Sequence, residues 1–138
     1  MNNTAKQQKI SNENSIIKIV IVEDNRFIRI GWEAVIQANK NFSLIGSFSD
    51  CETAFKSDAP QKTDLVLMDI GLPGMSGIEG VKYLKEKYPN IIIVMCTVHD
   101  DSEEIFQAIC AGAVGYLTKK TSPEELIKAL TEAYNGGS

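Results

Sequence analysis

The sequence predicts an α/β protein whose doubly wound parallel sheet has five strands, each followed by a helix. Two observations lead to this prediction. Five short apolar runs alternate with segments of helical periodicity, an arrangement typical of a parallel sheet with helices on both faces. Three of the runs are almost continuous Ile, Val and Leu, the pattern of strands that are buried on both faces.

The apolar runs set the expected strands, which span residues 16–22, 43–48, 64–68, 91–96 and 114–117. The second run alternates more than the others, which indicates an edge strand. Right-handed crossovers leave few topologies for such a chain. We expect the flavodoxin-like strand order 2-1-3-4-5, which places the functional site at the carboxyl ends of strands 1 and 3.

The segments between the strands carry helix signals. The first helix is expected over residues 26–38, with Phe27, Ile28, Val35 and Ile36 in the core. Later helices should begin at capping boxes, in which Ser or Asp is followed three residues later by Glu. These pairs are Ser49 with Glu52, Ser76 with Glu79, Asp100 with Glu103, and Ser122 with Glu125. The apolar stripe expected on the fourth helix comprises Ile105, Phe106, Ile109 and Cys110.

Length and composition predict one domain without a metal or disulfide scaffold. The chain has 138 residues and a net charge of -4, and no basic stripe favours nucleic-acid binding by this segment itself. Its three cysteines lack zinc-like spacing, which favours free thiols in a reducing cytoplasm. We expect a disordered leader over residues 1–15, a domain over 16–135 and the start of a linker at 136–138. No apolar stretch is long enough to cross a membrane.

Acidic residues follow two of the predicted strands. Asp69 ends the third strand ahead of a Gly/Pro turn, and Glu23 and Asp24 end the first. Thr97 and Lys119 end the fourth and fifth strands, so all five side chains should meet at one rim of the sheet. Clustered carboxylates are costly unless a cation or a reaction requires them, and their hard oxygens suit Mg²⁺. A single acid of this kind would be read equally well as a turn or capping residue.

Four motifs at this rim resemble the receiver domain of two-component response regulators. They are Ile-Val-Glu-Asp-Asn at 21–25, Leu-Met-Asp-Ile-Gly-Leu-Pro-Gly-Met-Ser-Gly at 67–77, Thr97, and Gly-Ala-Val-Gly-Tyr-Leu-Thr-Lys at 112–119. The resemblance implies a CheY-like fold and a phosphoacceptor role for Asp69, with a sensor histidine kinase as the phosphoryl donor. It also implies that Lys119 and Thr97 contact the phosphoryl group and that Tyr116 is the switch aromatic.

The resemblance further implies a Mg²⁺ site. Asp24 and Asp69 match the direct carboxylate ligands, and Glu23 matches an acid that often acts through water. The backbone carbonyl of Gly71 matches the third protein ligand. Gly71 stands where phosphatases with an aspartyl nucleophile place a general acid, so we expect a phosphoacceptor with slow autodephosphorylation rather than an enzyme.

Further motifs resemble the NarL/FixJ-type, or LuxR-class, subclass: Thr-Val-His-Asp-Asp at 97–101 and Thr-Ser-Pro-Glu-Glu-Leu at 121–126. That subclass implies transcriptional output through a C-terminal helix-turn-helix outside this chain, with DNA bound only there. A stand-alone receiver that acts through protein contacts, a phosphate-independent pseudo-receiver, and homodimerisation stay open. Lys120 replaces the proline that many receivers have after the lysine, so either Lys119 or Lys120 could act.

Overall fold

Five parallel strands form the sheet of the computed structural model, which describes residues 15–98 and 102–136. The strands are β1 (Ile17–Val22), β2 (Phe42–Phe48), β3 (Leu65–Asp69), β4 (Ile92–Thr97) and β5 (Gly115–Thr118). They pair in the order β2-β1-β3-β4-β5, which confirms the predicted topology and the edge position of the second strand. Apart from Ser15, the expected leader lies outside the described residues.

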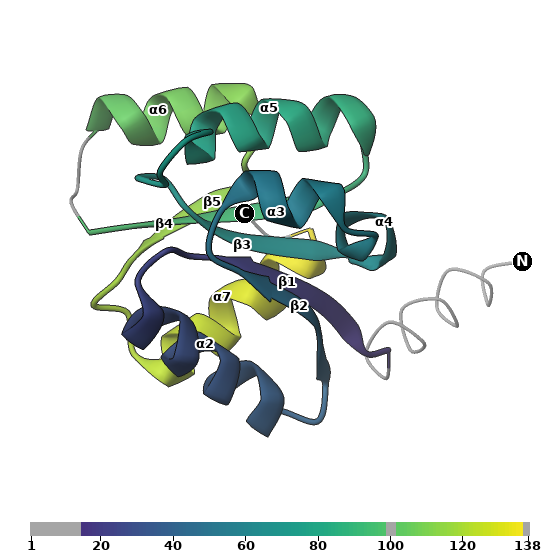
Figure 1. The fold of residues 1–138 in the computed structure, drawn as a ribbon. Coiled ribbons are helices and arrows are strands. Elements are labelled where there is room, and N and C mark those ends of the chain that lie inside the picture. The colour runs from purple at the N-terminus through teal and green to yellow at the C-terminus, as the bar shows by residue number, and fades with distance from the viewer. Residues whose placement is uncertain (1–14, 99–101, 137–138) are drawn as a thin grey trace, which may run out of the picture.

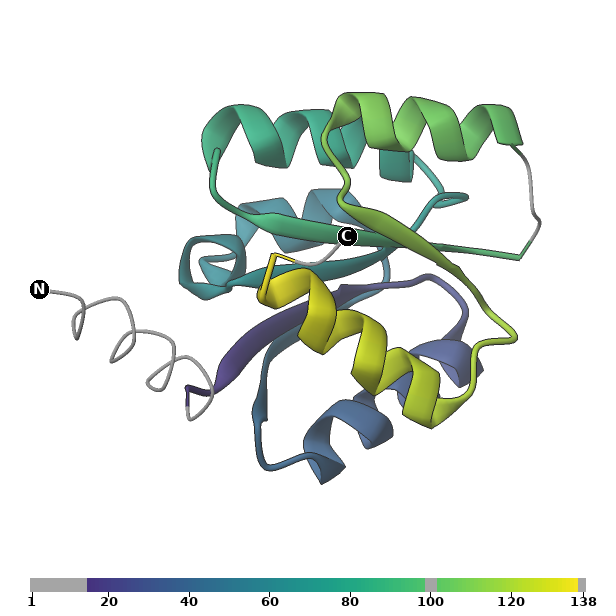
Figure 2. The same cartoon turned by 180° about the vertical axis from the view of Figure 1, so that it is seen from behind.

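Helices cover both faces of the sheet. On one face lie α2 (Arg26–Ala38) and α7 (Pro123–Tyr134), and on the other lie α3 (Cys51–Lys56), α4 (Ala59–Lys62), α5 (Gly77–Lys87) and α6 (Ser102–Ala111) (Figures 1 and 2). Among the described residues, no helix has both the length and the apolar character needed to span a bilayer. The three-layer arrangement is the one that the alternating sequence pattern predicts.

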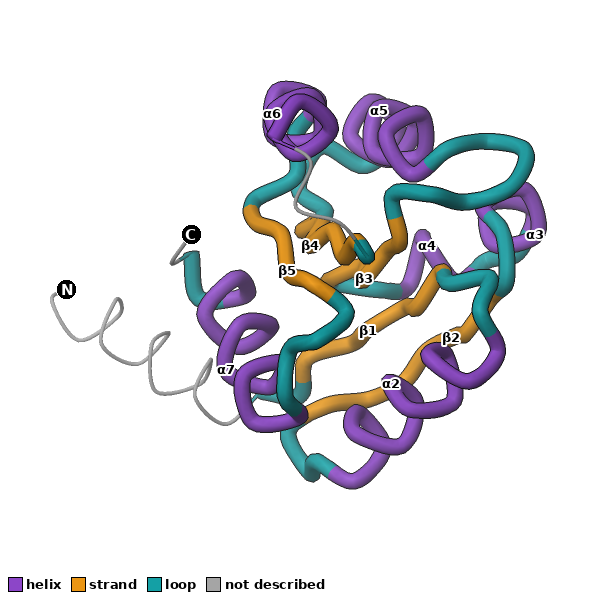
Figure 3. Tube along the Cα trace, turned by 90° about the vertical axis from the view of Figure 1, so that its left-hand side faces the viewer, coloured by secondary structure: helices purple, strands orange, loops and turns teal. Residues whose placement is uncertain are grey.

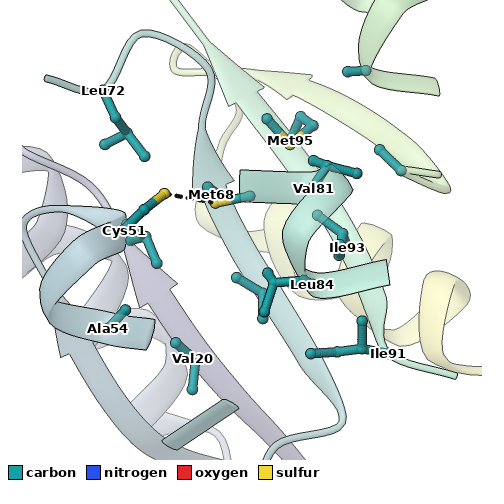
Figure 4. Packing of buried hydrophobic residues seen from close by; sticks show 14 of the residues in the cluster. Val20, Cys51, Ala54, Met68, Leu72, Val81, Leu84, Ile91, Ile93 and Met95 are labelled. Carbon is teal, nitrogen blue, oxygen red and sulfur yellow. Dashed lines mark hydrogen bonds between the residues drawn. The ribbon is translucent and has the colours of Figure 1, made fainter. Parts of the chain in front are cut away.

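The sheet separates two apolar cores. Successive side chains of a strand point to opposite faces, so β1 sends Ile19 and Ile21 toward α2 and α7, and Val20 and Val22 toward α3 and α5. Figure 4 shows the second of these cores, where Met68 of β3 lies between α3 and α5. Both faces of the inner strands are therefore buried, which explains their continuous apolar sequences.

Of the three free cysteines, Cys51 and Cys96 are buried and Cys110 is exposed. Burial raises the pKa of both the Cys51 and the Cys96 thiol to about 12. Cys51 Sγ lies 3.7 Å from Met68 Sδ, within the core of Figure 4. These two thiols serve as small apolar groups in the core.

Two of the predicted capping boxes are present, one is wrong, and one lies outside the described residues. Ser76 with Glu79 and Ser122 with Glu125 form reciprocal boxes at the starts of α5 and α7. Asp50, rather than Ser49, caps α3, because its carboxylate accepts a hydrogen bond from Thr53 N at 2.7 Å. A charged acceptor forms the stronger cap. The box of Asp100 with Glu103 includes residue 100, which the structure does not describe.

Two predicted core faces were partly wrong. On α2, Phe27 is 87% exposed, whereas Trp32 is buried beside Ile36. On α6, Phe106 is 68% exposed and Ile109 and Cys110 are also exposed; Ile105 and the small Ala108 face the core instead. In both helices the buried residues are three or four positions apart, and the error came from including apolar neighbours that point about 100° away.

Two helical glycines provide a matched test of core packing. A Cβ at Gly31 of α2 would meet no atom within 4 Å, whereas a Cβ at Gly80 of α5 would lie 2.9 Å from Cys51 Sγ. We expect Gly31→Ala to raise the free energy of unfolding by about 0.5–1 kcal/mol through helix propensity. Gly80→Ala should lower it by about 1–3 kcal/mol because it overpacks the core. Urea denaturation followed by circular dichroism measures both, and an equal gain in both variants would contradict this account.

Candidate functional site

The carboxyl ends of four strands converge on one rim, which faces the viewer in Figure 3. Backbone hydrogen bonds continue the pairing beyond the strands: Ile70 N donates to Cys96 O at 3.1 Å, and Lys119 N donates to Thr97 O at 3.0 Å. These bonds fix the residues that immediately follow β3 and β5. The side chains at this rim belong to strand ends and loops, but their backbone is held by hydrogen bonds to the sheet.

Three carboxylates meet at this rim. Glu23 is fully buried, Asp69 is 4% exposed, and Asp24 is exposed. One carboxylate oxygen from each lies within 4.8 Å of the others, a spacing that allows all three acids to share one metal ion. The prediction that the first and third strands bring their acids together is thus met by the geometry.

Lys119 places its ammonium group among these acids. Its Nζ lies 2.7 Å from Glu23 Oε1 and 3.3 Å from Asp69 Oδ2, and its side chain is only 10% exposed. Lys120, by contrast, is exposed. Of the two lysines that the sequence left open, Lys119 is the one in the acidic cluster.

Glu23 has further partners that hold its position. Asn25 N donates to Glu23 Oε2 at 2.9 Å, and Arg29 Nη1 donates to the Glu23 carbonyl at 2.7 Å. Arg29 was not predicted to support the site; its position six residues after Glu23, one turn into the following helix, is the signal that could have suggested it.

Burial and charge act in opposite directions on the buried pair. Desolvation raises the pKa of Glu23, and its hydrogen bonds to Lys119 and Asn25 only partly offset this effect, while the charge of Asp69 adds to it. Burial alone would lower the pKa of Lys119, but its contacts with Glu23 and Asp69 outweigh this and raise it. Lys119 is therefore held as a cation, and its one ammonium contacts two of the three clustered acids.

A hollow of about 330 Å³ opens above the acids. Its lining includes Asp24, Asp69, Gly71, Thr97, Val98 and Lys119. Gly71 N donates to Asp69 Oδ1 at 3.3 Å, and a Cβ at Gly71 would meet no atom within 4 Å. The hollow has room for a small anionic group beside Asp69.

The predicted switch residues, Thr97 and Tyr116, lie on β4 and β5, the last two strands in the order of the sheet. Thr97 ends β4 and pairs in register with Thr118, and it is half-buried. Tyr116 of β5 pairs with Met95 and is 41% exposed. His99 of the Thr-Val-His-Asp-Asp motif lies outside the described residues.

Comparison with known proteins identifies the family. The family model of the response regulator receiver domain matches residues 19–131. The chain belongs to the response regulator receiver domain family. The matched segment contains Glu23, Asp24, Asp69, Thr97 and Lys119, so the whole acidic cluster lies within the family's domain.

Curated relatives of this receiver domain include proteins described as transcriptional regulatory proteins and as response regulators. The chain is 38% identical over 120 residues to transcriptional regulatory protein YxjL of Bacillus subtilis, and 31% identical over 121 residues to response regulator UvrY of Escherichia coli. These matches cover 87% and 88% of this chain but only 55% and 56% of the relatives. The chain thus spans about half the length of the curated relatives it matches.

Solved structures agree with the family and the fold. A two-component response regulator of the LuxR family from Aurantimonas sp. superposes with a TM-score of 0.81 at 30% identity, covering 88% of this chain and 87% of that one. The receiver domain of a NarL response regulator from Mycobacterium tuberculosis has a TM-score of 0.83 at 22% identity, covering 88% and 98%, and supports the fold. The predicted likeness to NarL- and LuxR-type receivers is confirmed.

The two adjacent lysines allow a controlled test of the buried ion pair. Lys119→Met leaves the fully buried Glu23 without its cation and should lower the free energy of unfolding by about 2–4 kcal/mol, since breaking a buried pair strands a charge. Lys120→Met, at the exposed neighbour, should change it by less than about 0.5 kcal/mol.

Urea denaturation without divalent ions measures the stability of both variants. Adding Glu23→Gln to Lys119→Met removes the stranded charge and should restore part of the loss. Equal effects of the two lysine variants would show that the pair contributes no stability.

Proposed function

We propose that this receiver domain accepts a phosphoryl group on Asp69 and converts that modification into a conformational signal. The observation that carries this proposal is the placement of Asp69: its carboxylate lies at the base of an open hollow, 3.3 Å from the ammonium of Lys119 and beside two further acids. A nucleophilic carboxylate, a fixed cation and room for a tetrahedral anion are what phosphoryl transfer requires.

The donor set fits Mg²⁺. Asp24, Asp69 and the backbone carbonyl of Gly71 would bind the ion, with Glu23 acting as the second acid of the cluster. All of these donors are hard oxygens, and one lysine leaves their combined charge negative. The bound ion would supply positive charge opposite the carboxylates and the phosphoryl oxygens.

Asp69 and Lys119 would carry out the phosphoryl transfer itself. A carboxylate oxygen of Asp69 forms the new bond to phosphorus as the bond from phosphorus to the donor imidazole nitrogen of a histidine kinase breaks. Lys119 holds the transferred oxygens by charge. The product at Asp69 carries more negative charge than the carboxylate did, and this local electrostatic change is the input to the switch.

Thr97 and Tyr116 are the proposed readout. Thr97 lines the same hollow as Asp69. In the phosphorylated state its hydroxyl would contact the phosphoryl oxygens. Tyr116 is partly exposed on the neighbouring strand, and an inward rotation would bury it in the space that Thr97 vacates. Phosphorylation of Asp69 would then change the surface of the molecule at β4 and β5 through these two residues.

The output is proposed to be transcriptional. The support is that curated relatives are described as transcriptional regulatory proteins and are nearly twice as long as the matched segment. Residues 16–135 would be the receiver unit and 136–138 the beginning of a linker to a DNA-binding helix-turn-helix, in a protein that acts in the cytoplasm with a sensor histidine kinase. A stand-alone receiver is the second candidate.

Phosphorylation with a small donor tests the proposal. Incubating the chain with Mg²⁺ and acetyl phosphate should add the mass of one phosphoryl group per molecule, and Asp69→Asn should abolish this addition. Fluoroberyllate should bind the wild-type chain under the same conditions. Repeated turnover of phosphate esters would instead favour an enzyme, and the absence of any adduct or ligand effect would favour a pseudo-receiver.

Gly71 offers a test of the phosphoryl lifetime. It is exposed at the hollow, and because a Cβ on it would meet no atom within 4 Å, a long side chain at this position can extend over the site. We expect Gly71→Arg to slow autodephosphorylation by about threefold or more, because the long side chain restricts the access of attacking water. Gly71→Ala is the matched control. The decay of the phosphorylated mass measures both, and an unchanged lifetime in Gly71→Arg would refute the prediction.

A further inference from the structure

Glu52 does not cap its own helix; it contacts the segment that follows the proposed phosphoacceptor. Its Oε2 accepts a hydrogen bond from Met75 N at 2.9 Å. Met75 belongs to residues 70–76, here named the β3–α5 loop, which begins directly after Asp69 and carries Gly71. The contact joins the start of α3 to this loop across 23 residues of sequence.

The backbone conformation of Gly74 and its lack of a side chain allow this contact. Its φ of 68° lies in the left-handed region, and a Cβ on it would collide with the carboxylate of Glu52. A glycine is therefore favoured here for two reasons, the backbone conformation and the close approach of Glu52. The carboxylate and the loop backbone fit each other closely at this position.

Other contacts hold the two ends of the same loop. Leu72 is 7% exposed and belongs to the core that includes Cys51, the residue before Glu52 (Figure 4). At the far end, Gly77 N donates to Ile70 O at 2.9 Å, and Ser76 forms its capping box with Glu79. Glu52 adds a charged acceptor between these anchors, and such bonds are stronger than neutral ones.

We propose that Glu52 is a positioning residue for the cation site: by holding Met75 N, it keeps the β3–α5 loop in the arrangement that presents Gly71 next to Asp69. The inference rests on the proposed Mg²⁺-dependent function. Glu52 itself lies outside the hollow and acts through the loop backbone. Partners that orient metal ligands commonly influence metal affinity without touching the metal.

The test compares Glu52→Ala with Glu52→Gln in the full 138-residue chain. Calorimetric titration with Mg²⁺ alone gives the dissociation constant, and hydrogen exchange by NMR reports the Met75 amide. Glu52→Ala should raise the dissociation constant about threefold and accelerate Met75 exchange, as expected for loss of one exposed hydrogen bond. Glu52→Gln keeps an acceptor oxygen and should restore most of the affinity. Glu86→Ala, an exposed glutamate of α5, is the charge-matched control and should change neither quantity.

Each outcome decides one point. If Mg²⁺ affinity in Glu52→Ala equals that of the wild type while Met75 exchange accelerates, the positioning role is overturned. If Glu52→Gln weakens binding as much as Glu52→Ala, or Glu86→Ala weakens it equally, net charge rather than the hydrogen bond is responsible, and the proposal also fails. If the wild-type chain binds no Mg²⁺, the proposed function itself fails, which the wild-type titration alone reveals.

Gly74→Ala provides an independent variant. Its Cβ would displace the Glu52 carboxylate, so it should weaken Mg²⁺ binding in the wild-type background. Its backbone strain is common to both backgrounds, and a double-mutant cycle therefore isolates the contact with Glu52. Glu52→Ala should weaken binding little or no further once Gly74 is replaced, and strictly additive effects would overturn the proposal.

Discussion

The buried contact between Lys119 and Glu23 is the interaction on which the rim of the sheet depends. Lys119 follows β5 and Glu23 follows β1, strands that are separated in the sheet by β3 and β4. The lysine side chain therefore reaches across the carboxyl ends of two intervening strands and passes Asp69. A fully buried carboxylate is tolerable only with such a partner, so the ion pair ties the geometry of the site to the stability of the fold.

The fold could be predicted from the sequence because the apolar runs and turn residues that mark its strands are strong, local signals. Strand limits fell within one residue of the predicted ones, since Ile/Val/Leu runs bounded by turns have few alternative interpretations. Which residues of α2 and α6 face the core was harder to predict. Phe27 and Phe106 are large and apolar yet exposed, while the small Ala108 is buried. Periodicity alone cannot rank apolar neighbours on a helix, because tertiary packing decides which of them faces the sheet.

The acidic cluster was predictable for a different reason. Parallel strands deliver their carboxyl ends to one edge, so the order of strands together with strand-end acids was enough to bring Glu23, Asp24 and Asp69 together. The supporting contacts were not predictable in this way. Glu52 matched a local capping pattern, yet its partner is Met75, and Arg29 supports Glu23 through a backbone carbonyl. Contacts between a side chain and a distant backbone leave no periodic trace in the sequence.

The energetics of the proposed switch limit how it can work. Moving a population from 1:99 to 99:1 requires about 5.5 kcal/mol of differential interaction. One hydrogen bond to a charged group contributes about 1.5–3 kcal/mol, so a contact from Thr97 alone is insufficient. Lys119 already contacts Glu23 and Asp69. It therefore contributes to the switch only the difference in free energy between these contacts and its contacts with the phosphoryl oxygens. A decisive switch at Asp69 therefore requires Thr97, Lys119 and the burial of Tyr116 to act together, which couples the hollow to the exposed side of β5.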